Sequence, residues 1–209
     1  MDERTSQAVF NYWNEVRGIR LAPSRFEIEP SRITAFLPET FILEREGRGA
    51  YIFRLAGTRI CEQFGREFRG CNLMDLWTPE DREILVRLVE TVTREGAVGL
   101  VTLTASRTNG RTAAFEMLLL PLIHNGHEIN RIMGALASSE ATAGQPPFAA
   151  VRIDNFKLIW PDGRPHAVIS RMDNQQPFSR APEHSRIVRS ERRSFRVYDG
   201  GRPKDDSAS

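Results

Sequence analysis

Three apolar segments in the middle of the chain constrain the fold more than any other feature. Residues 98–106, 111–122 and 129–138 are separated by Asn-Gly pairs at 109–110 and 125–126. Asn-Gly between alternating segments is the strongest short-range sign of a hairpin, because both residues tolerate positive φ. The sequence therefore predicts a three-stranded antiparallel meander.

Two further strands are expected before the meander, at residues 40–45 and 50–56, joined by a Gly-containing turn. Between the two groups lie short helices and one longer helix at 79–96, which begins with Thr78-Pro79 and ends at Gly96. A five-stranded antiparallel sheet with helices on one face would bury these apolar stripes in one core, so the predicted class is α+β. The outer face of the sheet would be open to water or to a second copy.

An N-terminal helix is predicted over residues 5–17, with Ser6 as its cap. Its apolar stripe consists of Val9, Tyr12, Trp13 and Val16. The helix either folds back on its own sheet or covers the sheet of a partner. We expect three regions, a helical flank at 1–38, a core at 39–140, and a Pro/Arg-rich, irregular and partly ordered or disordered extension at 141–209.

The composition indicates the cellular compartment and whether the chain crosses a membrane. No apolar run approaches the roughly 18 residues that a membrane span needs, and the N-terminus lacks the layout of a secretory signal. Two cysteines, Cys61 and Cys71, make neither a disulfide framework nor a metal cage. We therefore expect a cytoplasmic protein with no membrane span.

Several short sequence motifs in the chain resemble those of a known family. Tyr-Trp at 12–13, Leu-Ala-Pro-Ser-Arg at 21–25, Phe-Arg-Leu-Ala-Gly-Thr at 53–58 and Leu-Pro-Leu at 120–122 together resemble a proteobacterial family of small single-domain PAS proteins. The resemblance implies a five-stranded PAS fold and a role as a sensor or regulatory protein in signal transduction. It also implies a homodimer built on the flanking helix, and it implies no named ligand.

A small apolar ligand between the sheet and the central helices would follow from that fold. The side chains that could line its pocket are Phe53, Leu55, Ile60, Cys61, Phe64, Trp77, Leu85, Leu88, Phe115, Met117 and Met133. Met and aromatic side chains make adaptable apolar walls. The alternative is that these residues simply fill the core.

Two cofactors common on this fold lack their sequence signals. Haem needs an axial ligand, and none of the four histidines lies on the helix at 79–96. Flavin photochemistry in PAS relatives uses a Cys in an Asn-Cys-Arg-Phe-type word, which is missing, since Cys71 follows Gly70 here. The cofactor is left unknown, with haem and flavin disfavoured. No metal spacing stands out.

The preferred function is a regulatory module without its own output domain, acting through ligand-modulated or constitutive contacts with a separate signalling protein. An enzyme on a similar α+β cup is the first alternative, and Arg54 and Glu116 are its test residues. The second alternative is an adaptor for nucleic acid, a cyclic dinucleotide or a membrane surface. It would use Arg189, Arg192, Arg193 and Arg196, because arginine forks suit phosphate.

Overall fold

The computed structural model describes the chain except for residues 2, 139–146, 162–166, 171–185, 191–192 and 198–209. The chain divides into two compact units, Met1–Met172 and Asp173–Ser209. The helices are α1 (Arg4–Arg17), α2 (Thr58–Phe64) and α3 (Pro79–Glu95), with 3₁₀ helices η1 (Arg25–Glu27), η2 (Pro30–Glu39) and η3 (Leu73–Leu76). The strands of the first unit are β1 (Thr40–Gly47), β2 (Ala50–Ala56), β3 (Val98–Arg107), β4 (Thr112–Ile123), β5 (Ile129–Ala137), β6 (Phe148–Ile159) and β7 (Ala167–Ser170).

The five predicted strands are all present and antiparallel, and the two Asn-Gly turns join β3 to β4 and β4 to β5. The sheet order is β2-β1-β5-β4-β3-β6-β7. The predicted α+β fold is therefore confirmed, with one correction. The sheet continues past β3 into β6 and β7, which come from a region that we expected to be irregular.

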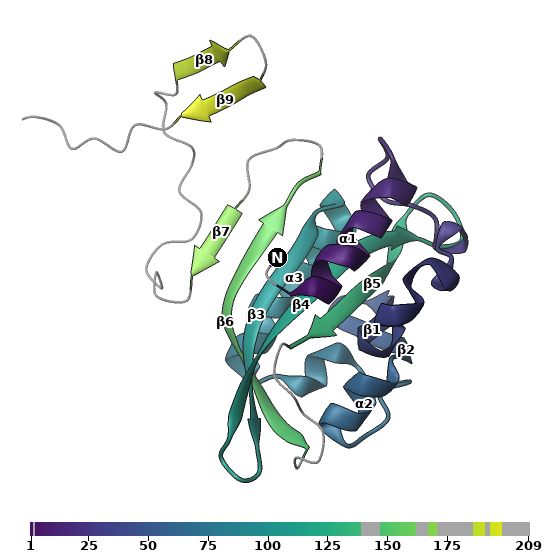
Figure 1. Cartoon of the computed structure of the whole chain (residues 1–209), viewed down its shortest axis with the longest axis vertical. Helices are drawn as coiled ribbons and strands as arrows, with labels where there is room; N and C mark the ends of the chain where they lie inside the picture. Colours follow the sequence, from purple (N-terminus) through teal and green to yellow (C-terminus); the bar gives the residue numbers. More distant parts are fainter. Residues whose placement is uncertain (2, 139–146, 162–166, 171–185, 191–192, 198–209) are drawn as a thin grey trace, which may run out of the picture. The chain divides into compact units, whose positions relative to one another are not determined.

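Both faces of the sheet are covered (Figure 1). On β4, Phe115 and Met117 face the core that α2, η3 and α3 close, whereas Leu118 and Leu120 face α1 and η2. This alternation follows from the two-residue period of a strand. The expectation of helices on one face is thus incomplete, because α1 and η2 bury the face that was expected to be open.

Local signals explain how the helices begin and end. The Thr78 side chain accepts a hydrogen bond from the Asp81 amide at 3.3 Å, and Pro79 is the first residue of α3. Gly96 ends that helix at φ 66°, in the left-handed region that favours glycine. The predicted cap of α1 is wrong, since Glu3 takes the cap position and Ser6 lies buried inside the helix.

The second unit contains a two-stranded antiparallel sheet, β8 (Arg186–Ser190) and β9 (Arg193–Val197). In its register Arg189 pairs with Ser194, and Ile187 pairs with Arg196. Three of the four arginines of the predicted anionic site, Arg189, Arg193 and Arg196, therefore lie on these strands. Arg192 lies outside the described residues.

Candidate functional site

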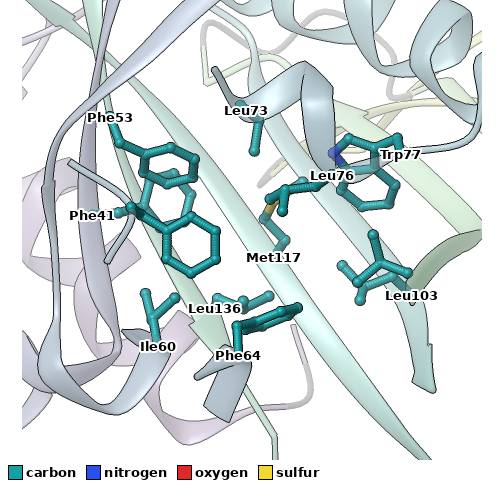
Figure 2. A pocket seen from close by; sticks show the side chains of 12 residues that line it. Phe41, Phe53, Ile60, Phe64, Leu73, Leu76, Trp77, Leu103, Met117 and Leu136 are labelled. Carbon is teal, nitrogen blue, oxygen red and sulfur yellow. The ribbon is translucent and has the colours of Figure 1, made fainter. Parts of the chain in front are cut away.

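A small apolar cavity of about 20 Å³ lies between the sheet and its inner helices (Figure 2). All its walls are hydrocarbon, aromatic or thioether side chains, contributed by six strands, α2, η3 and the connecting loops. The residues that line it are Phe41, Phe53, Ile60, Phe64, Phe68, Leu73, Leu76, Trp77, Leu103, Met117, Leu136 and Val151. Such a volume holds about one water-sized group.

Aromatic rings pack edge to face around this cavity. The Phe41 and Phe53 ring centroids lie 5.6 Å apart, and those of Phe64 and Phe68 also lie 5.6 Å apart. Phe64 also lies 5.8 Å from Phe148, the first residue of β6. Offset and edge-to-face pairs at these distances are favourable. In this conformation these rings pack against one another beside the cavity.

The cavity shares five residues with the set that the sequence predicted for a ligand pocket. Phe53, Ile60, Phe64, Trp77 and Met117 line the cavity. Four more predicted residues belong to the same core cluster without being among the lining residues. Of these, Leu85, Leu88 and Phe115 are buried, and Cys61 packs against the cluster partly exposed.

Two predicted lining residues face the other way. Leu55 is 46% exposed, because the pairing of β1 with β2 shifts register between Ile42 and Leu43 and the alternation of β2 reverses after Phe53. Met133 is buried on the α1 side, whereas its neighbour Ile132 faces the inner helices. A one-residue error in strand phase moves a side chain to the opposite face.

Several residues that line the cavity were not among those predicted from the sequence. Leu103 pairs with Phe115, and their shared face follows from strand alternation, so that residue could have been found. Val151 could not, because it lies on β6, a strand that was not predicted. An isolated parallel bridge joins Val151 to Trp77 and closes this side of the cavity.

A second, partly open hollow of about 240 Å³ adjoins the first. It lies where β6 begins, beside the α2–η3 connection. The residues that line it are Phe64, Arg66, Asp75, Leu76, Phe148, Ala149, Ala150 and Val151. Phe64, Leu76 and Val151 line both spaces. These three side chains therefore form the wall between the cavity and the hollow.

Two titratable side chains of the inner core have raised pKa values. Burial raises the pKa of the Cys61 thiol, with a further increase from the nearby Glu67 carboxylate. Burial also raises the pKa of Tyr51, whose hydroxyl lies 3.5 Å from the Thr93 hydroxyl. In the part of the chain that the structure describes, no three His, Cys, Asp or Glu side chains gather as a metal site would require.

The residues named for the enzyme alternative lie away from the cavity. Arg54 is exposed and paired with Glu44 and Glu46. Glu116 is buried on the outer face of the sheet, where it accepts a hydrogen bond from the Glu3 amide at 3.4 Å. Neither side chain lines the cavity or the hollow.

The stripe expected to contact a partner instead packs on the chain's own sheet. Val9 and Trp13 are fully buried there, Tyr12 is 6% exposed, and Val16 is partly buried. The Trp13 indole donates a hydrogen bond to the Pro121 carbonyl at 2.9 Å, and the Tyr12 hydroxyl accepts one from the Glu29 amide at 2.6 Å. The sequence left open whether α1 folds back on its own sheet or covers the sheet of a partner. In the structure it folds back on its own sheet.

A family model described as PAS domain matches residues 1–137. The chain therefore belongs to the PAS domain family, whose members are sensory modules. No curated protein matches it significantly. Among the residues that the structure describes, no helix has both the length and the apolar character that a membrane crossing requires.

The solved structures similar to this chain include two that are described as PAS domains and one that is described as a light-oxygen-voltage domain. One is described as "Flavin Analogue Sheds Light on Light-Oxygen-Voltage Domain Mechanism". It is 16% identical with a TM-score of 0.42, and the match covers 53% of this chain and 83% of that one. The PAS domain of a Colwellia psychrerythraea protein is 16% identical with a TM-score of 0.39, covering 54% and 95%. A PAS domain of an HTR-like protein from Haloarcula marismortui is 17% identical with a TM-score of 0.36, covering 55% and 94%.

Proposed function

We propose that this chain is a sensory module that binds a small molecule in the cavity and reports through the position of α1. One observation carries the proposal. On β4, Met117 lines the cavity, and the next residue, Leu118, is fully buried on the face that α1 covers. A ligand that changes the packing around Met117 thus also acts on the surface beneath α1. It would bind one of two packings more tightly and so shift their populations.

The output is a contact with a second copy or with a separate signalling protein. When α1 leaves its sheet, the stripe containing Trp13 and the strand face containing Leu118 and Leu120 become exposed together. A second copy offers the same two surfaces, so an exchange of α1 between copies is a low-cost route to a homodimer. Two free cysteines favour the reducing cytoplasm as its location.

Filling the cavity from the strand side tests the proposal without knowledge of the ligand. Leu136 lies on β5 and lines the cavity, and Leu136→Phe adds volume there. We expect amide hydrogen exchange in α1 to accelerate about tenfold more than exchange in α3, the equivalent of about 1.4 kcal/mol. Sedimentation of the same variant should show a larger dimer fraction than the wild type.

The matched control is Val92→Ala, a fully buried core change on α3 that does not line the cavity. It should cost about 2 kcal/mol of global stability and accelerate exchange in both helices alike. Equal effects of the two variants on α1 would count against coupling between the cavity and this helix.

A further inference from the structure

One of the side chains that line the cavity, Trp77, carries a polar group that is unpaired. Within the described part of the chain, the Trp77 indole nitrogen is buried and has no hydrogen-bond partner, and the side chain is 6% exposed. Figure 2 shows this nitrogen on the side of the ring that faces Leu73 and Leu76. Leaving a buried donor unpaired costs about 1–3 kcal/mol. An acceptor that took the place of Leu76 beside this nitrogen would recover part of that cost.

The hollow beside β6 offers a path by which a ligand could enter the cavity. Phe64 and Leu76 are partly buried, and both line the hollow as well as the cavity. Rotation of these two side chains would join the spaces without breaking a strand. The hollow of about 240 Å³ is then the larger part of the joined volume. The volume of the hollow is slightly smaller than the roughly 300 Å³ of the smallest pockets that bind drug-sized ligands.

The hollow is lined by charged side chains of both signs. Arg66 and Asp75 both line the hollow, so its mouth presents one positive and one negative side chain. Arg66 also lies with its guanidinium 4.7 Å from the centre of the Phe68 ring. An ionised ligand would gain little at such a mouth, and it would lose its hydration inside without a counter-charge.

From these three features we infer the chemical class of the ligand, an uncharged molecule about the size of one aromatic ring that carries a carbonyl-type hydrogen-bond acceptor. The acceptor pairs with the Trp77 indole N–H, and the ring lies among the phenylalanines where Phe64 and Leu76 now stand. This inference rests on the proposed function, because it names the molecule that the sensory module would bind.

Three probes of nearly equal shape separate the contributions. Acetophenone carries the carbonyl, α-methylstyrene replaces its oxygen by a methylene group, and benzoate is charged. Titrations followed by NMR of the Met117 and Leu136 methyl groups give the three dissociation constants. In the wild type, acetophenone alone should move the Trp77 indole proton downfield, and benzoate should bind most weakly.

The Trp77→Phe variant isolates the hydrogen bond from the difference in hydrophobicity between the probes. The ratio of the α-methylstyrene to the acetophenone dissociation constant should fall about fivefold to tenfold in this variant, as expected for one hydrogen bond. Trp160→Phe is the matched control, because its indole nitrogen bonds Glu95 at 3.3 Å and it does not line the cavity. The ratio should not change there.

Two outcomes overturn the inference. One is an unchanged ratio in Trp77→Phe together with an unmoved Trp77 indole proton in the wild type. The other is that none of the probes shifts the cavity methyl groups at millimolar concentration. Neither result bears on the Leu136→Phe experiment, which measures the coupling between the cavity and α1. Failure of the inferred ligand class is therefore distinguishable from failure of the sensory role.

Discussion

The Asp81 carboxylate on α3 accepts a hydrogen bond from the Ile153 backbone amide on β6 at 3.1 Å. Asp81 is fully buried. The bond falls where the pairing of β3 with β6 shifts register, between Thr102 and Leu103. A side chain of the first helical turn thereby fastens the sixth strand to the PAS core at its irregular point.

Replacement of Asp81 should therefore loosen β6 from the sheet. Asp81→Ala leaves the Ile153 amide without this acceptor, and we expect a loss of about 1–3 kcal/mol in the free energy of unfolding. Asp81→Asn keeps an acceptor oxygen and should lose less. Denaturant titration gives the stability, and amide exchange of residues 148–159 locates the loss.

The control is Glu83→Ala on the same helix, because that carboxylate is exposed and pairs with Arg87 at 4.0 Å. It should change stability by no more than about 0.5 kcal/mol. If Asp81→Ala and Glu83→Ala have equal effects, the buried bond does not hold β6.

The same strand shows where sequence patterns stop being informative. The buried residues of β6 are Phe148, Val151, Ile153 and Leu158, which lie three, two and five positions apart. Register shifts at two places in its pairing with β3 break the two-residue alternation by which strands are recognised. The strand is thus specified by contacts with β3 and Asp81, which are distant in sequence.

Elements with strong local signals were predictable. The ends of α3 follow from Thr78 and Gly96, and the meander follows from its Asn-Gly turns. Five of the eleven candidate pocket residues line the cavity. Leu55 was misplaced because a bulge reverses its strand, and Met133 because it lies on the opposite face of β5. The role of Trp77 as a buried unpaired donor is a property of the packed structure that its sequence neighbours do not reveal.

The bond from Trp13 to Pro121 should be the main polar attachment of α1 to the sheet. Pro121 lies past the last β3–β4 pair, Gly99–Leu119, so its carbonyl is available to a side chain. Trp13→Phe removes the donor, and we expect a loss of about 1–3 kcal/mol with faster amide exchange in residues 4–17. Both are measurable by denaturant titration and exchange.

Phe10→Leu serves as the comparison on the same helix. Phe10 is partly buried, and its ring centroid lies 6.2 Å from that of Trp13. This change should cost less than about 1.5 kcal/mol. A Trp13→Phe protein as stable as Phe10→Leu would show that apolar contact alone holds the helix.

Gly134 and Phe41 should not tolerate a methyl group between them. They are partners across β1 and β5, and a Cβ at Gly134 would overlap the Phe41 ring, which lines the cavity. Gly134→Ala should cost about 1–3 kcal/mol by overpacking. The Phe41 ring resonances should shift in NMR spectra, because the ring must move toward the cavity.

Gly47→Ala is the matched glycine change, since nothing lies within 4 Å of a Cβ there. It should stay within about 0.5 kcal/mol of the wild type. Equal stability of the two alanine variants would mean that the ring has room to move without loss of packing.

The loop after α1 should depend on pH through Glu27. The hydrogen bond from Arg20 lowers the pKa of Glu27, and the Ser24 amide lowers it further. Because the folded pKa is depressed, the contribution of this carboxylate to the loop is present above its unfolded pKa and is lost as the pH falls through the folded value. Both side chains are largely exposed, so salt should weaken the effect.

Carboxyl-carbon NMR titration of Glu27 in the wild type and in Arg20→Gln measures this directly. Removal of the guanidinium should raise the pKa of Glu27 toward the ordinary glutamate value, and the bond to Ser24 should keep part of the depression. The midpoint at which the Ser24 amide resonance shifts should move upward with it. Identical titration midpoints for Glu27 in the two proteins would show that the pair with Arg20 does not persist in solution.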